Sequence, residues 1–399
     1  MDNYASFGKE ILISLENHGF SAYFVGGYVR DFLLGIPSMD IDIATSATPE
    51  QVMALFPDTK ETGLRFGTVT VLRGGFGYEV TTFRTDGAYR DSRHPVGVRY
   101  SQTLEEDLVR RDFTVNALAM DAQGVIHDFC GGKEDLKKGI LRAIGDPDVR
   151  FAEDALRILR AFRFVAKLGF VIEPATLESI ARNHSRLRDI SAERILQEFK
   201  YILRHTHVPQ AFSAMEACGL SATFPELSEG IAFVSRQPSC PLDPLQFFAL
   251  SFHLHRCDVP EGWRFSNKEK DRIAKLLDLL EVTESDVYGP ELVYAYGPEV
   301  CLSANAVSRY LRPGTDQEDR IREIDRTLPI RRVCDLAFKG QDILELTDLK
   351  DVRLIGEIVG DLVLSVITGK LPNEYEALKD HALKKIASFS AEGTPHGRD

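Results

Sequence analysis

Hydrophobic and polar residues alternate along Asp40–Ala44, where two aspartates flank an isoleucine. A period of two predicts a β-strand that buries its isoleucines and turns Asp40 and Asp42 to the other face. Similar patterns, with turn chemistry at Gly74-Gly75, predict further strands, and Thr48-Pro49 opens a short helix. The other predicted strands are Tyr23–Val25, Gly67–Leu72 and Tyr78–Phe83, and a helix is expected at Val29–Leu34.

From about Phe151 onward the apolar spacing becomes that of helices. Seven apolar positions between Phe151 and Ala166 share one helix face, and Gly169 offers a left-handed C-terminal cap. No strong strand pattern follows residue 145. The chain is therefore predicted to be α+β, with a small mixed α/β head followed by an extended all-helical region. Further helices are expected at Pro174–Asn183, Ala192–Arg204, Gln210–Cys218, Pro244–Leu254, Asn267–Leu280 and Arg353–Thr368.

Composition excludes several classes of protein. No apolar run in the 399 residues reaches membrane-spanning length. Six cysteines lie far apart without a Cys-x-x-Cys pair, which argues against zinc and for reduced thiols in a cytosolic protein. The net charge of −12 argues against bulk attraction of nucleic acid, yet Leu136–Arg204 holds 14 Lys and Arg against 9 Asp and Glu. Such a basic stripe suits either contact with one RNA face or a solvated helix surface.

The glycine pair Gly26-Gly27, followed by Asp40 and Asp42, indicates phosphate chemistry. Glycines let the backbone approach a triphosphate because no Cβ blocks the way. Two carboxylates on one strand can hold divalent cations that clamp a phosphoryl displacement. Alone, an Asp-x-Asp triplet is more often a solvated strand edge, and the second copy, Asp146–Asp148, is interpreted as a turn because of its proline. The glycine pair and the apolar alternation favour nucleotidyl transfer.

Two later motifs carry charge. Arg110 and Arg111 precede Asp112, which is expected to cap a helix, so the arginines could grip phosphate or could form a charged helix surface. In Glu153–Arg163, Asp154 and Arg157 are predicted neighbours on one helix. A solvated amphipathic helix is the default interpretation. The same pair could also recognise a nucleobase edge, with the carboxylate accepting from the amine of cytosine or adenine and the guanidinium donating to ring acceptors.

Together these motifs resemble a class II tRNA nucleotidyltransferase, the CCA-adding enzyme family of the DNA polymerase β-like superfamily. The resemblance covers residues 20 to about 205 closely and extends loosely to Phe265–Lys268 and Gly340–Asp342. It implies a catalytic nucleotidyltransferase head at 1–145, a base-recognising helical neck at 146–205, a helical body at 206–340 and a tRNA-binding helical tail at 341–399. The matching motifs are Gly26–Asp31 with Asp40 and Asp42, Arg110–Ala117, Asp128 with Gly131-Gly132, Glu153–Phe164 and Ser191–Arg194.

The resemblance also implies a reaction: the 3′-hydroxyl of tRNA attacks the α-phosphate of CTP or ATP, without a template, and pyrophosphate leaves. Asp40 and Asp42 are then the catalytic ligands of Mg²⁺. Glu79 is the candidate for a third metal-site carboxylate, although a surface strand residue is the commoner explanation of its position. The nucleotide-binding residues implied are Gly27, Arg30, Arg111, Asp154, Arg157, Arg160 and Arg163.

Several alternatives stay open at this point. The chain could be the A-adding enzyme of a split CC/A system, a poly(A) polymerase, or a non-catalytic RNA-binding protein of the same fold. The apparently full-length loop Arg84–Pro95 favours CCA or A addition over CC addition, and Arg65–Thr68 matches the tRNA-type enzymes better than poly(A) polymerases. No membrane and no protein partner are implied, and a cytoplasmic location is expected.

Overall fold

The computed structural model describes residues 2–86, 89–91, 94–95, 98–283, 287–347 and 351–392. Residues 87–88 and 92–93 of the loop expected at Arg84–Pro95 lie outside the described residues. The chain forms two compact units, residues 1–244 with 260–265 and residues 245–259 with 266–399. The α+β class predicted from the sequence is confirmed, because the sheet lies in the N-terminal head and the remainder is mostly helical.

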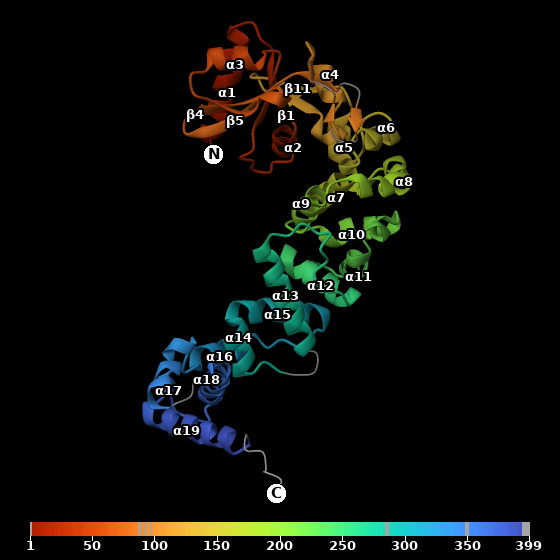
Figure 1. Cartoon of the computed structure of the whole chain (residues 1–399). Helices are drawn as coiled ribbons and strands as arrows, with labels where there is room; N and C mark the ends of the chain where they lie inside the picture. The colour runs from red at the N-terminus through yellow and green to blue at the C-terminus, as the bar shows by residue number, and fades with distance from the viewer. Residues whose placement is uncertain are drawn as a thin grey trace. The chain divides into compact units, whose positions relative to one another are not determined.

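A mixed seven-stranded sheet is built from the described residues of the head (Figure 1). Its strand order is β11-β10-β1-β2-β5-β4-β3, and all neighbours are antiparallel except β2 and β5, which run parallel. The strands are β1 (Ala22–Val25), β2 (Asp42–Thr45), β3 (Thr59–Gly63), β4 (Thr68–Arg73), β5 (Phe76–Thr82), β10 (Leu118–Met120) and β11 (Ile126–Asp128).

Short elements surround this sheet. Two further strand pairs, β6 with β9 and β7 with β8, belong to the loop after β5. The bounds are α1 (Asp2–Asn17), α2 (Gly27–Leu33), α3 (Pro49–Leu55), η1 (Leu64–Phe66), β6 (Arg84–Asp86), β7 (Tyr89–Asp91), β8 (His94–Pro95), β9 (Val98–Tyr100), α4 (Leu104–Val109), η2 (Thr114–Asn116), α5 (Gly132–Lys138) and β12 (Ile140–Leu141).

The two faces of the sheet differ in polarity. On one face α1 covers an apolar layer in which the ring of Tyr4 stacks on Tyr78 with centroids 4.9 Å apart. On the other face α4 contributes Leu108 to a core with Ala44. Asp42 precedes Ala44 by two residues and therefore lies on the same face, and its register partner Val25 belongs to that core. The alternation of β2 thus places a carboxylate beside the core, where it lines a cavity.

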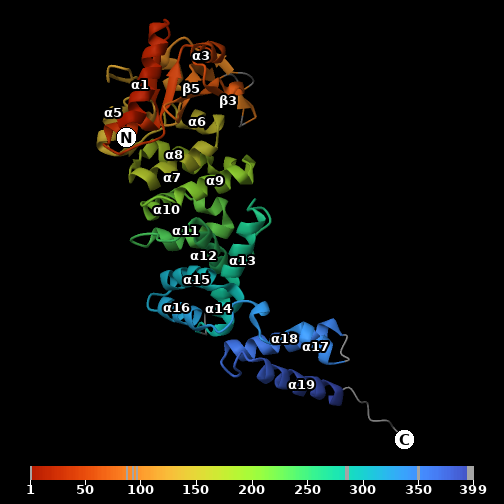
Figure 2. The ribbon, with the colours of Figure 1, turned by 90° about the vertical axis from the view of Figure 1, so that its left-hand side faces the viewer.

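After the head, unit 1 continues as helices, in which α7 packs on both α9 and α10, and α10 packs on α11 (Figure 2). The predicted absence of strands after residue 145 is wrong in one detail, since the two residues of β13 pair in parallel with β12. The elements are α6 (Pro147–Glu153), α7 (Leu156–Leu168), β13 (Val171–Ile172), α8 (Pro174–Asn183), η3 (His184–Asp189), α9 (Ala192–Ile202), α10 (Val208–Ala217), η4 (Leu220–Thr223) and α11 (Pro225–Ser235).

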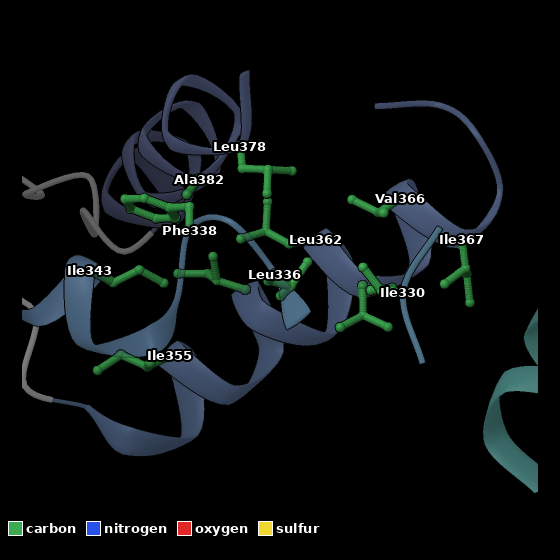
Figure 3. Close-up of a cluster of buried hydrophobic side chains, with 12 residues drawn as sticks. Ile330, Leu336, Phe338, Ile343, Ile355, Leu362, Val366, Ile367, Leu378 and Ala382 are labelled. Atoms are coloured by element: carbon green, nitrogen blue, oxygen red, sulfur yellow. The ribbon is translucent and has the colours of Figure 1, made fainter. Parts of the chain in front are cut away.

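Unit 2 is helical in its described residues. Its last three helices enclose a core in which Phe338 lies near Ala382 and Leu378 (Figure 3). Leu362 and Val366 of α18 point into the same cluster. The helices of this unit are α12 (Pro244–His255), α13 (Asn267–Val282), α14 (Pro290–Tyr296), α15 (Pro298–Leu311), α16 (Glu318–Thr327), η5 (Val333–Asp335), α17 (Gly340–Leu346), α18 (Val352–Ile367) and α19 (Tyr375–Glu392).

Candidate active site

The turn after β1 brings an arginine beside an aspartate. Gly26 has a φ of +69°, a left-handed conformation that L side chains rarely adopt. A Cβ at this position would lie 3.0 Å from Nη1 of Arg111 and 3.9 Å from Oδ2 of Asp42. The missing side chain therefore lets the Arg111 guanidinium lie over the turn, and α2 begins at the next residue, Gly27.

Three carboxylates gather where β2 and β5 run side by side. Asp42 is the first residue of β2 and pairs in register with Glu79. Asp40 lies in the preceding loop, so the strand begins two residues later than the alternation predicted. Burial and the charge of Asp40, with a smaller effect of Glu79, raise the pKa of Asp42 to about 6, although Arg111 opposes the shift. The Asp42 carboxylate therefore lies in an excess of negative charge.

Arg30 of α2 is a charged residue with only 2% of its surface exposed. Its Nε donates to Asp31 at 2.8 Å and its Nη1 donates to Asn116 of η2 at 2.6 Å. Its guanidinium also lies 5.4 Å from the ring centroid of Phe164 in α7. The second oxygen of Asp31 accepts from Lys167 of α7 at 2.9 Å. These contacts fix Arg30 between the head and α7, and the single Asp31 carboxylate pairs with both Arg30 and Lys167.

The arginine pair predicted to precede a helix instead follows one. α4 ends at Val109, and Arg110 and Arg111 both reach back to Asp107, with shortest contacts of 2.7 and 3.0 Å. Burial opposes ionisation of Asp107, but the two guanidinium groups hold its pKa below the usual value. Asp107 therefore orients both arginines, and Arg111 is the one that reaches Asp42.

Asp112 does not cap a regular helix as predicted, because only a three-residue 3₁₀ turn follows and Phe113 is its N-cap residue. The Asp112 carboxylate accepts from Phe113 N at 2.8 Å, from Asn116 Nδ2 at 3.2 Å and from Arg160 of α7. Although burial opposes it, the Arg160 charge lowers the pKa of Asp112 to about 2. Asp112 is thus a buried link between the head and α7.

The helix predicted across Phe151–Ala166 is broken in the middle. α6 ends at Glu153, Asp154 is extended with φ −146° and ψ 104°, and α7 starts at Leu156. The side chain of Asp154 causes part of this break, since its Oδ1 accepts from the Leu156 backbone N–H at 3.0 Å. Asp154 and Arg157 are therefore not stacked on one helix face, as the spacing suggested. The prediction of a turn at Asp146–Asp148 is also wrong, because Asp146 is the N-cap of α6.

Asp154 and Arg157 each have a partner that orients them. Oδ2 of Asp154 accepts from Arg194 of α9 at 3.1 Å. Arg157 donates to Glu153 at 2.5 Å, to the Arg150 carbonyl at 3.1 Å and to the Arg110 carbonyl at 3.3 Å. One acceptor and one donor are thereby held at the break between α6 and α7.

Further along α7, Arg163 is partly buried. It donates to Glu198 of α9 at 3.3 Å, and its guanidinium lies 5.1 Å from the Phe164 ring and 5.3 Å from the Tyr201 ring. Burial and the neighbouring charge of Arg160 lower the pKa of Arg163. The face of α7 that lines the cavity therefore carries more positive charge than the neighbouring carboxylates neutralise.

One cavity of about 940 Å³ is lined by most of these charged groups. The sequence-predicted residues come from the head and from α7, and each of them lines this cavity. They are Gly27, Arg30, Asp40, Asp42, Arg111, Asp154, Arg157, Arg160 and Arg163. Glu79, predicted only as a weak candidate, lines the cavity as well.

Sequence reasoning missed several residues of this cavity. Lys167 could have been found by continuing the arginine stripe of α7 by one helical turn beyond Arg163. Phe66 was noted only within the segment Arg65–Thr68 and not as a site residue, and no sequence signal pointed to Tyr201 or His205, because these positions depend on how η1 and α9 pack around the cavity.

Comparisons with known proteins agree with this geometry. Residues 22–142 match a poly A polymerase head domain, residues 169–231 an RNA- and SrmB-binding site of polymerase A, and residues 249–382 a tRNA nucleotidyltransferase domain 2. The chain is 37% identical to a CCA-adding enzyme of Limosilactobacillus fermentum over 93% of this chain and 94% of that protein. It is also 37% identical to one of Geobacillus stearothermophilus, over 92% and 94%.

Solved structures give the same result. The crystal structure of Bacillus stearothermophilus CCA-adding enzyme in complex with CTP matches with a TM-score of 0.87 and 34% identity, covering 98% of this chain and all of that one. A Thermotoga maritima CCA-adding enzyme, with a TM-score of 0.63 and 20% identity over 96% and 94% of the two chains, shares the fold.

The head and its cavity thus define a nucleotidyltransferase, a class of enzyme that generally depends on a metal ion. With relatives at 37% identity over nearly its whole length, the chain belongs to the family of CCA-adding enzymes. Among the described residues, no helix combines the length and the apolar composition needed to cross a membrane.

Proposed function

We propose that this chain adds C, C and A to the 3′ end of tRNA without a template, using CTP and ATP and releasing pyrophosphate in the cytoplasm. The observation that carries the proposal is that the carboxylates Asp40 and Asp42, the arginines Arg30 and Arg111, and the pair Asp154 and Arg157 all line one cavity. The likeness of the whole chain to a solved CCA-adding enzyme that holds CTP supports it. The proposed regions are a catalytic head at 1–145, a base-recognising neck at 146–205, a body at 206–340 and a tRNA-binding tail at 341–399.

The proposed metal ligands are Asp40 and Asp42, with Glu79 as a third carboxylate, and the proposed ion is Mg²⁺. The raised pKa of Asp42 fits such a site, since a bound cation would offset the charge that Asp40 and Glu79 impose. Within the described residues, no three ligating side chains converge tightly enough to form a closed metal cage. This suits Mg²⁺, which commonly binds one or two carboxylates together with substrate phosphates. When bound, it would activate the attacking hydroxyl and neutralise the leaving group.

Arg30, Arg111 and the backbone at Gly27 would hold the triphosphate. The Arg111 guanidinium lies over the glycine turn and its charge acts on Asp42, so it favours an α-phosphate close to Asp42. The RNA 3′-oxygen would then form a bond to the α-phosphorus, its proton would be lost, and the bond from the α-phosphorus to the bridging oxygen would break. Pyrophosphate takes the electron pair of that bond, so no covalent enzyme intermediate is needed.

Asp154 and Arg157 would select the base. A carboxylate accepts hydrogen bonds at both oxygens, so Asp154 can accept from an exocyclic amine in addition to Leu156 and Arg194. Cytosine and adenine present that amine, whereas uracil and guanine present a carbonyl that would leave an acceptor unpaired. The contacts of Arg157 with Glu153 and two carbonyls hold its guanidinium in one orientation. Arg160 and Arg163 would complete the nucleotide site along α7.

Nucleotide addition with Mg²⁺ to three tRNAs, ending at the discriminator base, at C and at CC, tests the proposal. Completion of CCA on the shortest tRNA with CTP and ATP is the expected result. Addition of A alone, and only to the CC-ended tRNA, would make the chain an A-adding enzyme. Long A tails on unrelated RNA would indicate a poly(A) polymerase, and no incorporation at all would indicate an RNA-binding protein.

A further inference from the structure

The cavity is larger than its candidate nucleotide residues require. Its volume of about 940 Å³ is at the upper end of the roughly 300–1,000 Å³ range of single small-molecule sites. Part of its lining, formed by Phe66, Thr68, Thr81 and Arg84, belongs to β4, to β5 and to the segments beside them. None of these four residues is among the proposed ligands of metal or nucleotide. This part of the cavity therefore has room for a second substrate, an inference that rests on the proposed function.

Sheet order places these four residues on one side of the carboxylates. Across the sheet, Val25 of β1 pairs with Asp42 of β2, Asp42 pairs with Glu79 of β5, and Glu79 pairs with Thr70 of β4. Gly26-Gly27 continues from β1, on the Asp42 side of this row. Phe66 precedes β4, on the Glu79 side and toward the opposite end of the strands. The carboxylates therefore lie between the glycine turn and Phe66.

The geometry of phosphoryl transfer predicts on which side of the carboxylates each of the two substrates lies. The attacking oxygen and the leaving oxygen lie roughly in line on opposite sides of the phosphorus. If the glycine turn holds the β- and γ-phosphates, pyrophosphate leaves on the β1 side of the carboxylates. The attacking 3′-hydroxyl must then arrive from the β5 and β4 side, and the 3′-terminal nucleotide of the RNA lies over Thr68 and Thr81. Both residues line the cavity, and their hydroxyl groups are 2.9 Å apart.

Phe66 stands out on this side because its side chain is exposed while its backbone is fixed. The residue is 48% exposed, and among the described residues no other aromatic ring packs on it. Its carbonyl accepts from Nη1 of Arg84 at 2.8 Å. The following residue, Gly67, has a φ of +79°, and its carbonyl accepts from the Thr82 backbone N–H at 2.9 Å. Exposed aromatic rings on a fixed backbone are the usual stacking surfaces for single-stranded nucleic acid.

We propose that Phe66 is a positioning residue for the RNA substrate: its ring stacks on the base of the 3′-terminal nucleotide and holds that nucleotide's 3′-hydroxyl toward Asp42 and Glu79. Stacking tolerates any base, because every base has a π face. That property suits a site whose terminal base changes as each nucleotide is added. Phe66 takes no part in binding the incoming nucleotide.

Steady-state nucleotide addition by Phe66→Ala tests the proposal, with a CCA-lacking tRNA and CTP. Loss of one stacked base should lower kcat/KM for the tRNA about 5- to 150-fold and leave KM for CTP unchanged. Phe66→Trp should restore most of the activity. Phe129→Ala is the matched control, because Phe129 is also 48% exposed in the head but does not line the cavity. It should behave like the unsubstituted chain.

An RNA that lacks its 3′-terminal base distinguishes stacking from a merely structural role. On this RNA the unsubstituted chain should lose activity, and Phe66→Ala should cost little further, because the stacking partner is already absent. An equal loss on both RNAs, a raised KM for CTP, or full activity of Phe66→Ala would each overturn the inference while leaving the proposed function intact. No incorporation by the unsubstituted chain would overturn the proposed function itself.

Discussion

Arg160 of α7 donates from both Nε and Nη2 to the same oxygen of Asp112, at 2.8 and 2.5 Å. Asp112 belongs to the segment that follows the arginine pair, so this ion pair joins the head to α7, the helix of Arg157, for which we propose a role in base selection. Only 7% of the Asp112 side chain is exposed, against 33% of Arg160. An unpaired Asp112 carboxylate would therefore cost more free energy of folding than an unpaired Arg160 guanidinium.

Breaking this pair should destabilise the protein. Removing one partner of a buried pair costs about 3–5 kcal/mol, and the partial exposure of Arg160 lowers our expectation for Asp112→Asn to about 2–3 kcal/mol. Urea unfolding at neutral pH measures the change. Glu10→Gln, which breaks the exposed pair with Arg73, is the control and should cost less than about 1 kcal/mol. Equal stability of the two variants would contradict the buried link.

The raised pKa of Asp42 predicts a pH dependence of the metal-free protein. Because its folded pKa of about 6 exceeds the ordinary 3.8, the protonated carboxyl favours folding, and this contribution is lost as pH rises through 6. Asp42→Asn, which mimics the protonated form, should be more stable than the unsubstituted chain at pH 7.5 in EDTA, by up to about 3 kcal/mol. The difference should disappear near pH 4. A difference that does not vary with pH would contradict the charge crowding.

The metal assignment predicts a loss of chemistry without a loss of RNA binding. Asp40→Ala combined with Asp42→Ala should reduce nucleotide incorporation by at least about 10³-fold, because the transition-state charge is no longer stabilised. The affinity for tRNA, measured by filter binding, should change less than about threefold, since neither carboxylate attracts RNA. Asp58→Ala, an exposed head aspartate outside the cavity, is the control. Undiminished incorporation by the double variant would refute the assignment.

Base selection should depend on Arg157 and, through Asp154, on Arg194. Arg157→Ala should reduce the preference for CTP and ATP over UTP and GTP about 5- to 150-fold, as expected for losing buried hydrogen bonds. Arg194→Ala should give a smaller change in the same direction, because it frees the Asp154 carboxylate to turn. The readout is kcat/KM for each of the four nucleotides. Arg188→Ala, an exposed substitution outside the cavity, should leave the ratios unchanged.

The sequence by itself determined the class of fold and the candidate metal- and nucleotide-binding residues that line the cavity. A strand with a period of two turns alternate residues to opposite faces, so Asp42 and Ile43 of β2 had to face opposite ways. The glycine pair required a turn that only glycine forms readily, and Arg111 lies where the missing Cβ leaves space. Strand alternation and glycine turns can be predicted from a sequence because they depend on residues only a few positions apart.

Only the tertiary structure decided which residues serve as partners. The break between α6 and α7 was invisible because the apolar periodicity runs through it, and Asp154 is held there by Arg194, 40 residues away in sequence. The sequence predicted that Asp112 caps a helix, whereas in the structure its carboxylate accepts from Arg160, 48 residues away. Phe66 belongs to the segment Arg65–Thr68, which the sequence matched to the tRNA-type enzymes, but no pattern predicted that its side chain would line the cavity. Such pairings arise from packing between distant segments, and no periodicity within either segment encodes them.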